Sequence, residues 1–269
     1  MTHLAVVQMV SGSDVEINLN RAEVLIREAA AKGAQLVLLP ENFALFDSQQ
    51  LYSLAEDEKA NKPVLYWLSG LSKSLGIWLF AGSFPLLGNS AANRKVRSAL
   101  QVFDPAGRCV ARYDKRHLFD VDVSDNQGVY LESAFIEAGD EFVVVETEMG
   151  KVGLSICYDL RFPKHFWKLR ELGADIIVVP SAFTKVTGEA HWEVLLRARA
   201  VETQCYILGA NQGGQHSPSR ETSGDSMIID PWGTVVSRCC MGEGVALAEL
   251  DSSLLNRVRK SMPVLSQQR

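Results

Sequence analysis

The chain has 269 residues, of which 47% are hydrophobic and 22% charged, and its formal net charge is −5. This composition is ordinary for a globular protein that buries a sizeable core. It excludes nucleic acid as an expected partner, because no basic stripe is present. It also excludes a membrane span, because no apolar run approaches the roughly 18 residues that cross a bilayer.

The cysteines and the first residues of the chain indicate a compartment. The 5 cysteines lack the spacing of a disulfide framework. Residues 1–10 lack the basic and apolar regions of a signal peptide. We therefore expect a protein of the reducing cytoplasm.

Strands and helices are expected to alternate over the first part of the chain. Gly33 is suited to end the first helix, Pro63 to begin the second, and Asp104–Gly107 has the residues of a tight turn. In order, the predicted elements are strand Leu4–Met9, helix Asn18–Lys32, strand Gln35–Leu39, a helix from Pro63 to Gly76, and strands Ile77–Ser83, Val96–Phe103 and Arg108–Lys115.

A long loop separates these elements from a second series. Arg116–Asp140 has neither a helical nor a strand period, and loops of that length are usually functional. Asp251 or Ser252 can cap a last short helix. Between them we expect strands Phe142–Glu146 and Lys151–Ile156, helix Lys164–Leu172, strand Asp175–Val179, helix Glu189–Thr203, and strands Cys205–Ala210, Ser226–Ile229, Thr234–Arg238 and Val245–Leu250.

The two series contain an internal echo. Gly33–Phe43 matches Gly173–Phe183, an offset of 140 residues, and each copy follows a predicted strand and helix. Two units are too few for a solenoid. The echo therefore predicts two similar α/β halves related by a pseudo-twofold axis.

Cys157 directly follows a predicted apolar strand and precedes Pro163, which suits the first turn of a helix. A thiol in that position lies at the carboxyl end of a sheet, where ligands bind in open α/β folds. Backbone N–H groups just past it can point at an oxyanion. The alternative is a buried cysteine that acts as a small apolar residue.

Glu41 and Lys115 stand at two other predicted strand ends. A carboxylate in a partly dry site has a raised pKa and can act as a general base. A nearby cation favours the thiolate form of a cysteine and stabilises an oxyanion. With Cys157 these residues indicate acyl transfer through a thioester. A partly buried ion pair without a catalytic role is the alternative.

Other chemistry has weaker support. The 5 histidines are scattered, although a Cys–His pair stays open. No Cys-x-x-Cys pair or His-Glu-x-x-His motif suggests a metal, and no Gly-x-Gly-x-x-Gly follows a strand, so we expect neither a metal nor an organic cofactor. A thiol redox centre at the adjacent Cys239 and Cys240 is a further alternative.

Three segments at these strand ends carry a family resemblance: Leu39–Phe43, Tyr113–Phe119 and Ile156–Pro163. On them, and over nearly its whole length, the chain resembles the nitrilase or carbon–nitrogen hydrolase superfamily. It is most similar to the amidase branch that acts on deaminated glutathione and ω-amides. Segments that resemble the deaminated glutathione side of this branch are Gly188–Trp192, Arg197–Tyr206 and Asp230–Gly233.

The resemblance implies an α/β fold, an α-β-β-α sandwich of two mixed sheets with pseudo-twofold related halves, in one domain over residues 1–269. It implies a homodimer or larger homo-oligomer, with the tail from about residue 251 at an interface. It assigns Glu41 as base, Lys115 as oxyanion stabiliser and Cys157 as nucleophile. Glu132 matches a second glutamate that positions the lysine or helps proton transfer, and the backbone N–H of Tyr158 completes the oxyanion hole.

The resemblance also suggests substrate contacts. Arg161 is expected to bind a substrate carboxylate bidentately, Thr187 to donate its hydroxyl and Phe183 to wall the acyl chain. The alternative for Arg161 is an ion pair with Asp159 or another helix acid.

Two positions depart from the family pattern. Lys164 stands where relatives commonly have Glu, and Asp225 where close relatives often have His. If Asp225 faces the pocket, its charge disfavours a dianionic substrate. This departure bears on the substrate and not on the reaction.

We therefore expect a hydrolase that cleaves a small linear carboxamide through a cysteine thioester, with deaminated glutathione as the best substrate. An ω-amide or an N-carbamoyl amino acid is the first alternative, and a nitrile fits less well. A non-catalytic binding protein of the same fold is the remaining one, and the intact Glu41, Lys115 and Cys157 argue against it.

Overall fold

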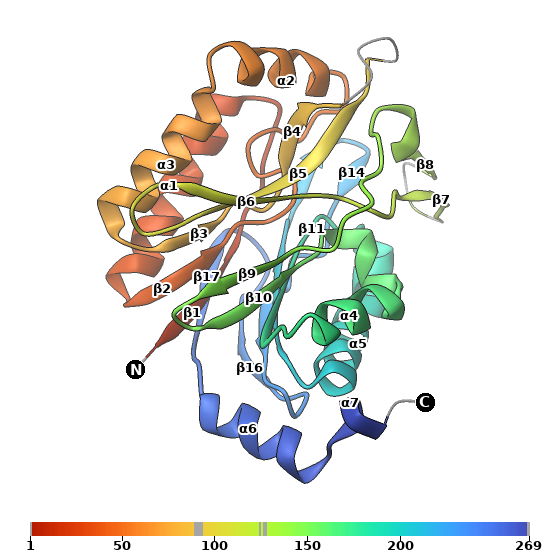
Figure 1. The fold of residues 1–269 in the computed structure, drawn as a ribbon. Helices are drawn as coiled ribbons and strands as arrows, with labels where there is room; N and C mark the ends of the chain where they lie inside the picture. Colours follow the sequence, from red (N-terminus) through yellow and green to blue (C-terminus); the bar gives the residue numbers. More distant parts are fainter. Residues whose placement is uncertain (1, 89–93, 124, 126–127, 268–269) are drawn as a thin grey trace.

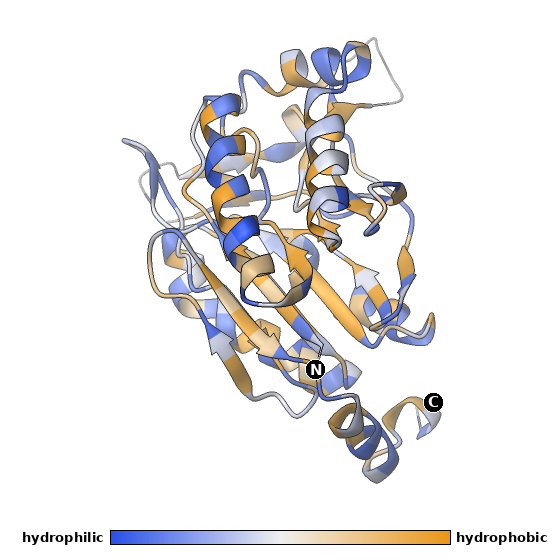
Figure 2. Cartoon of the chain, turned by 90° about the vertical axis from the view of Figure 1, so that its left-hand side faces the viewer, coloured by the Kyte–Doolittle hydropathy of each residue, from blue (hydrophilic) through white to orange (hydrophobic). Residues whose placement is uncertain are grey.

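The computed structural model describes residues 2–88, 94–123, 125 and 128–267. Two mixed sheets pack face to face, and helices cover their outer faces (Figure 1). The strands are largely hydrophobic, whereas the helices are polar on one side and apolar on the other (Figure 2). Within the described residues, no helix is long and apolar enough to cross a membrane.

The first sheet has a parallel centre and antiparallel edges. Its strands, in spatial order, are β17 (Gly244–Glu249), β1 (His3–Gln8), β2 (Ala34–Leu38), β3 (Trp78–Phe80), β5 (Val96–Phe103) and β4 (Phe84–Leu87), with β6 (Cys109–Asp114) also paired to β5.

The second sheet repeats this arrangement, with a parallel centre flanked by antiparallel strands. Its strands, in spatial order, are β9 (Val144–Thr147), β10 (Gly150–Leu154), β11 (Ile176–Ser181), β12 (Tyr206–Asn211), β15 (Met227–Ile229) and β16 (Val235–Arg238). Apolar side chains from both sheets form one buried cluster between them, which includes Leu36 and Val178.

The helices begin and end where local chemistry requires. Asp14 accepts a hydrogen bond from the N–H of Ile17, so the first helix begins earlier than the predicted Asn18. Pro63 opens a helix as predicted, and Gly76 ends it at φ 65°. The helices are α1 (Val15–Ala31), α2 (Leu51–Ala60), α3 (Pro63–Leu75), α4 (Pro163–Glu171), α5 (Lys185–Thr203), α6 (Ser252–Ser261) and α7 (Val264–Gln267).

The first two parallel strands of each half pair in equivalent positions, which confirms the predicted sandwich of similar halves. Leu4 of β1 pairs with Leu36 of β2, and Val152 of β10 pairs with Ile176 of β11. In each half one helix joins the first two strands and another leads into the third. As a result, the carboxyl ends of the central strands in both sheets point toward a shared edge of the molecule.

Several short elements were not predicted. The expected loop 116–140 contains β7 (Asp120–Asp122), β8 (Val129–Leu131) and a 3₁₀ turn over Glu132–Ala134, while its residues 124, 126 and 127 lie outside the described residues. The hairpin of β13 (Gln215–Ser217) and β14 (Arg220–Glu221) was also missed, as was α2. Strands of two or three residues are too short to show a period.

Candidate active site

Glu41 lies just beyond β2, in a segment held closely by its neighbours. Its backbone carbonyl accepts a hydrogen bond of 3.0 Å from the side chain of Gln212. Behind it, Gly82 adopts φ +53°, and a Cβ there would lie 2.0 Å from the carbonyl oxygen of Pro40. Only glycine permits this approach. The Glu41 side chain is therefore buried at a rigid strand end.

Cys157 follows β10 and begins the 3₁₀ turn Cys157–Arg161. It has φ +47°, a left-handed conformation that is uncommon for a residue with a side chain. Such strain is kept only where the surroundings enforce it. The turn therefore presents the sulfur in a conformation that the rest of the fold maintains.

The carboxylate of Asp159 holds the Cys157 turn in this conformation. Its buried carboxylate accepts hydrogen bonds from the Tyr113 hydroxyl at 2.6 Å and from the N–H of Ile156 at 2.8 Å. It also accepts from the backbone N–H of His117 at 3.0 Å and lies 2.6 Å from His117 Nδ1. Burial alone would raise the pKa of Asp159, but these hydrogen bonds outweigh it and lower the pKa. The charged carboxylate thus ties the cysteine turn to β6 and to the segment after it.

Lys115 joins two carboxylates from different parts of the chain. Its Nζ lies 2.8 Å from Glu41 Oε1 and 2.8 Å from Glu132 Oε1. Glu132 is held in turn by the N–H of Phe119, 2.6 Å from Oε2. The structure therefore brings together all four predicted catalytic residues, since Cys157 lines the same cavity. The loop position of Glu132 gave no sign of this without the family resemblance.

The charges in this cluster depend on burial. Burial disfavours the Lys115 cation, yet the carboxylates of Glu132 and Glu41 raise its pKa well above the usual range. Burial raises the pKa of Glu132, which Lys115 partly offsets. Burial, and then the adjacent Glu41 carboxylate, raise the pKa of the Cys157 thiol far above its ordinary value. The resting thiol is therefore neutral, and a base must remove its proton.

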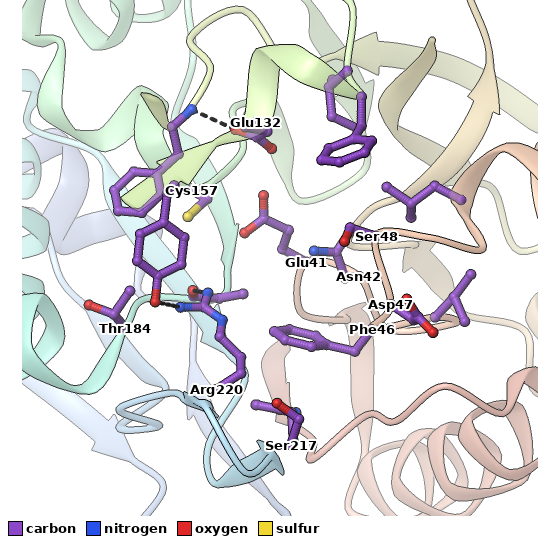
Figure 3. A pocket seen from close by; sticks show the side chains of 18 of the residues that line it. Glu41, Asn42, Phe46, Asp47, Ser48, Glu132, Cys157, Thr184, Ser217 and Arg220 are labelled. Atoms are coloured by element: carbon purple, nitrogen blue, oxygen red, sulfur yellow. Dashed lines mark hydrogen bonds between the residues drawn. The ribbon is translucent and has the colours of Figure 1, made fainter. Parts of the chain in front are cut away.

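These side chains open onto a cavity of about 640 Å³, within the range of small-molecule sites. Figure 3 shows the Glu41 carboxylate directed toward the Cys157 sulfur, with Glu132 on the same side. Three of the predicted substrate contacts line this cavity, namely Tyr158, Phe183 and Thr187.

Arg161, the fourth predicted contact, does not line the cavity. Its guanidinium carbon lies 5.6 Å from the centre of the Phe183 ring, behind the wall, and its two Nη atoms lie 3.3 Å from His191 Nδ1. The alternative of an ion pair with Asp159 is wrong, because the oxygens of that carboxylate accept from Tyr113, Ile156 and His117.

The two departures from the family pattern lie away from the cavity. Asp225 forms an ion pair of 2.8 Å with Arg238 Nε and is not among the lining residues. Lys164 is exposed at the start of α4. Neither charge therefore acts directly on a bound substrate.

Arg220 lines the cavity and was missed by the sequence reasoning. It belongs to β14, donates hydrogen bonds to the Tyr130 hydroxyl and the Ala182 carbonyl, both at 2.9 Å, and lies over the ring of Phe46. No motif marks it, because the contacts come from three distant parts of the chain.

Among the described residues, one group could bring three metal ligands together: His117, Asp159 and His165, whose ligand atoms lie within 4.8 Å of one another. However, both oxygens of Asp159 already accept hydrogen bonds, two of them from backbone N–H groups. A metal would have to displace contacts that hold the cysteine turn. We therefore conclude that these three residues hold the cysteine turn in position rather than bind a metal.

Comparisons with known proteins agree with the geometry. A family model described as carbon–nitrogen hydrolase matches residues 3–260. The chain is 40% identical to the deaminated glutathione amidase of Yersinia enterocolitica, covering 99% of this chain and 93% of that protein. It is 42% identical to the mouse deaminated glutathione amidase, covering 99% of this chain and 83% of that protein.

Solved structures show the same fold. The NitFhit protein of Caenorhabditis elegans superposes with a TM-score of 0.91 at 38% identity, covering all of this chain and 65% of that fusion protein. Nit3 of Saccharomyces cerevisiae, a member of branch 10 of the nitrilase superfamily, superposes with a TM-score of 0.88 at 30% identity, covering 100% of this chain and 96% of that one.

Proposed function

This chain belongs to the carbon–nitrogen hydrolase family, and on that basis we propose that it hydrolyses a small linear carboxamide through a thioester on Cys157. One observation carries the proposal. Lys115 Nζ lies 2.8 Å from the carboxylates of both Glu41 and Glu132, at the wall of a cavity that the Cys157 thiol shares. An ion pair with a purely structural role has no need of a nucleophile beside it.

The first half of the reaction begins with a proton transfer. Because the thiol is neutral at rest, Glu41 takes its proton as the sulfur attacks the amide carbonyl carbon. The carbonyl oxygen becomes an oxyanion, which the Lys115 ammonium and the backbone N–H of Tyr158 stabilise. The C–N bond then breaks, Glu41 returns the proton to the leaving nitrogen, and an acyl thioester remains.

In the second half of the reaction, water hydrolyses the thioester with Glu41 again as the base. Glu41 accepts a proton from the water as its oxygen attacks the thioester carbon, and the sulfur leaves as thiol when the proton returns. Glu132 keeps Lys115 in place throughout, through contacts of 2.8 and 2.9 Å. The reaction needs no metal or organic cofactor, since each proton and charge has a partner in these side chains.

We propose deaminated glutathione as the substrate, as the names of the relatives suggest. Phe183 and Thr187 line the cavity that the nucleophile shares, and we propose that the 2-oxoglutaryl acyl group lies against them. Arg161 lies directly behind Phe183 and forms no ion pair among the described residues, and we propose that it turns into the cavity to bind the acyl carboxylate.

A substrate panel tests the proposal. Purified enzyme is incubated with deaminated glutathione, 2-oxoglutaramate, an N-carbamoyl amino acid and a simple nitrile, and product release is measured for each. Fastest turnover of deaminated glutathione is expected. Fastest turnover of another compound would replace the substrate, and selective labelling of Cys157 by iodoacetamide with no hydrolysis at all would favour a binding protein.

We also propose a homodimer formed by an exposed apolar surface on α5 and the turn before β16. Val194, Val201 and Trp232 are each more than half exposed there. Val201 packs against that turn, because a Cβ on Gly233 would meet it at 2.6 Å. Light scattering should give twice the monomer mass for the native chain and the monomer mass for the Val201→Glu variant.

A further inference from the structure

Arg220 carries a charge that the proposed chemistry does not use. The charged residues on the cavity wall are Glu41, Asp47, Lys115, Glu132 and Arg220. Lys115 is neutralised by two carboxylates. Among the described residues, Arg220 forms no ion pair within 4.0 Å, so it is a cation that faces a ligand site without a protein anion bound to it.

The Arg220 side chain is nevertheless held in place. The Tyr130 hydroxyl and the Ala182 carbonyl each accept a hydrogen bond of 2.9 Å from its Nη atoms. Its guanidinium carbon lies 4.9 Å from the centre of the Tyr130 ring and 5.6 Å from that of Phe46. These contacts use two of its five N–H donors, and the others remain for an anion.

The distance from Arg220 to the nucleophile suits an extended leaving group. The N–H of Ala182 points at the Cys157 sulfur, and the carbonyl of the same residue accepts from Arg220. Ala182 therefore lies between the sulfur and the guanidinium and is close to both, which limits their separation to roughly 10 Å. Two extended residues of a peptide reach about 7 Å beyond the scissile nitrogen.

The position of Glu41 indicates on which side of the cavity the leaving group lies. It returns a proton to the leaving nitrogen, so that nitrogen must lie against the Glu41 carboxylate. Phe46 follows Glu41 in the same segment, and its ring leads to Arg220 (Figure 3). Arg161 lies behind Phe183, outside the cavity lining and on the side proposed for the acyl group. The leaving group therefore extends along Phe46 toward Arg220.

We propose that Arg220 binds the terminal carboxylate of a dipeptide leaving group, and that it thereby selects substituted amides over primary amides. This inference rests on the proposed amidase function. Deaminated glutathione has such a leaving group, cysteinylglycine, whereas 2-oxoglutaramate has the same acyl group and releases only ammonia. The two compounds differ at the end of the cavity where Arg220 stands.

The test is the Arg220→Gln variant, assayed on both compounds. The kcat/KM for deaminated glutathione should fall about 10- to 100-fold, mostly through KM, because a charge-assisted hydrogen bond is lost. The kcat/KM for 2-oxoglutaramate should change by no more than about threefold. Arg220→Lys should recover part of the loss, since lysine keeps the positive charge but lacks the planar pair of N–H donors that binds a carboxylate bidentately.

A change in the ligand provides a matched control. A substrate whose terminal carboxylate is capped as a carboxamide should be a poorer substrate for the native enzyme, and as good for Arg220→Gln as the uncapped compound. If the cap and the substitution instead act independently, Arg220 does not contact that carboxylate.

The remaining outcomes separate the two proposals. Equal losses on both compounds in Arg220→Gln would overturn the leaving-group role and leave the amidase function standing. A native enzyme that hydrolyses neither compound would overturn the proposed function and this inference with it. A matching Arg161→Gln variant should lose activity on both compounds, because they share the acyl carboxylate.

Discussion

The two halves of the molecule use one scaffold and differ in the residues at its strand ends. The register of the central strands aligns Glu41 with Ser181, and Cys157 with Met9. The turns at Asp104 and Asp230 have identical backbone hydrogen bonds, which aligns Lys115 with Met241. One set therefore contains a carboxylate, an ammonium and a thiol, and the other contains a serine and two methionines.

The difference shows what the fold requires and what the chemistry requires. The strands, turns and helices recur in both halves because they bury the same kind of core. The charged cluster is present once, and Glu41 and Lys115 of the first half meet Cys157 of the second. Substitutions at paired positions should therefore affect activity in one set and only packing in the other.

The largest effect is expected for Cys157→Ala. Loss of the nucleophile should lower turnover by at least about 10³-fold, because no thioester can form. The fold should persist, with an unchanged circular dichroism spectrum. Met9→Leu is the matched control and should keep near-native activity, since the two side chains have similar volume. An acyl adduct trapped on Cys157→Ala by mass spectrometry would contradict the assignment.

Glu41→Gln should have the next largest effect. Without a base for the neutral thiol, turnover should fall about 10²- to 10³-fold while the hydrogen bond to Lys115 is kept in neutral form. Ser181→Ala at the paired position should change kcat/KM by less than about threefold, because its hydroxyl makes only a long contact of 3.4 Å among the described residues. Near-normal kinetics in Glu41→Gln would remove this residue from the mechanism.

Asp159→Asn should affect stability rather than the chemical step alone. Loss of the buried charge that four groups surround should lower the free energy of unfolding by about 2–4 kcal/mol at pH 7. The folded-state pKa of Asp159 is lowered, so its contribution is present above the unfolded pKa and is lost as the pH falls through the folded one.

Urea unfolding at pH 7 and at pH 3 measures both parts of this prediction, and the variant should lose less stability in acid than the native chain. The paired position holds Ser11, whose hydroxyl donates 2.9 Å to the Phe43 carbonyl. Ser11→Ala should cost about 1 kcal/mol with no acid dependence of its own. Equal costs at both positions would mean that the Asp159 charge has no special role.

The smallest effect concerns His216, which joins the halves. Its Nδ1 lies 2.7 Å from the Ser11 carbonyl and its Nε2 lies 2.7 Å from the Thr222 hydroxyl. Burial lowers the pKa of His216 to about 4, with Arg220 adding to the shift. The unfolded chain therefore binds a proton at a higher pH, and folding stability falls between pH 6.5 and 4.

We expect His216 to account for about 2 kcal/mol of this loss. His216→Gln cannot titrate, so its stability should decline less than that of the native chain between pH 7 and pH 4.5, in paired urea titrations. Parallel curves for the two proteins would show that the imidazole is not kept neutral by the fold.

Much of the fold was predictable because it depends on local signals. Alternating apolar runs placed the central strands, Pro63 and Gly76 bounded a helix, and the echo between residues 33–43 and 173–183 predicted the paired halves. Those features arise from backbone preferences and from side-chain periods that neighbouring residues in the chain display. The shortest of the missed elements, β13 and β14, are too short to display either.

The candidate site divides in the same way. The sequence by itself determined that Glu41, Lys115 and Cys157 stand at strand ends, because each follows a readable strand. Only the tertiary structure decided which charges meet. It placed Glu132 on Lys115, turned Asp225 toward Arg238, kept Arg161 behind Phe183 and brought Arg220 to the cavity wall. Loop residues carry no period, so their partners are set by contacts between distant segments, which appear only when both sheets have packed together.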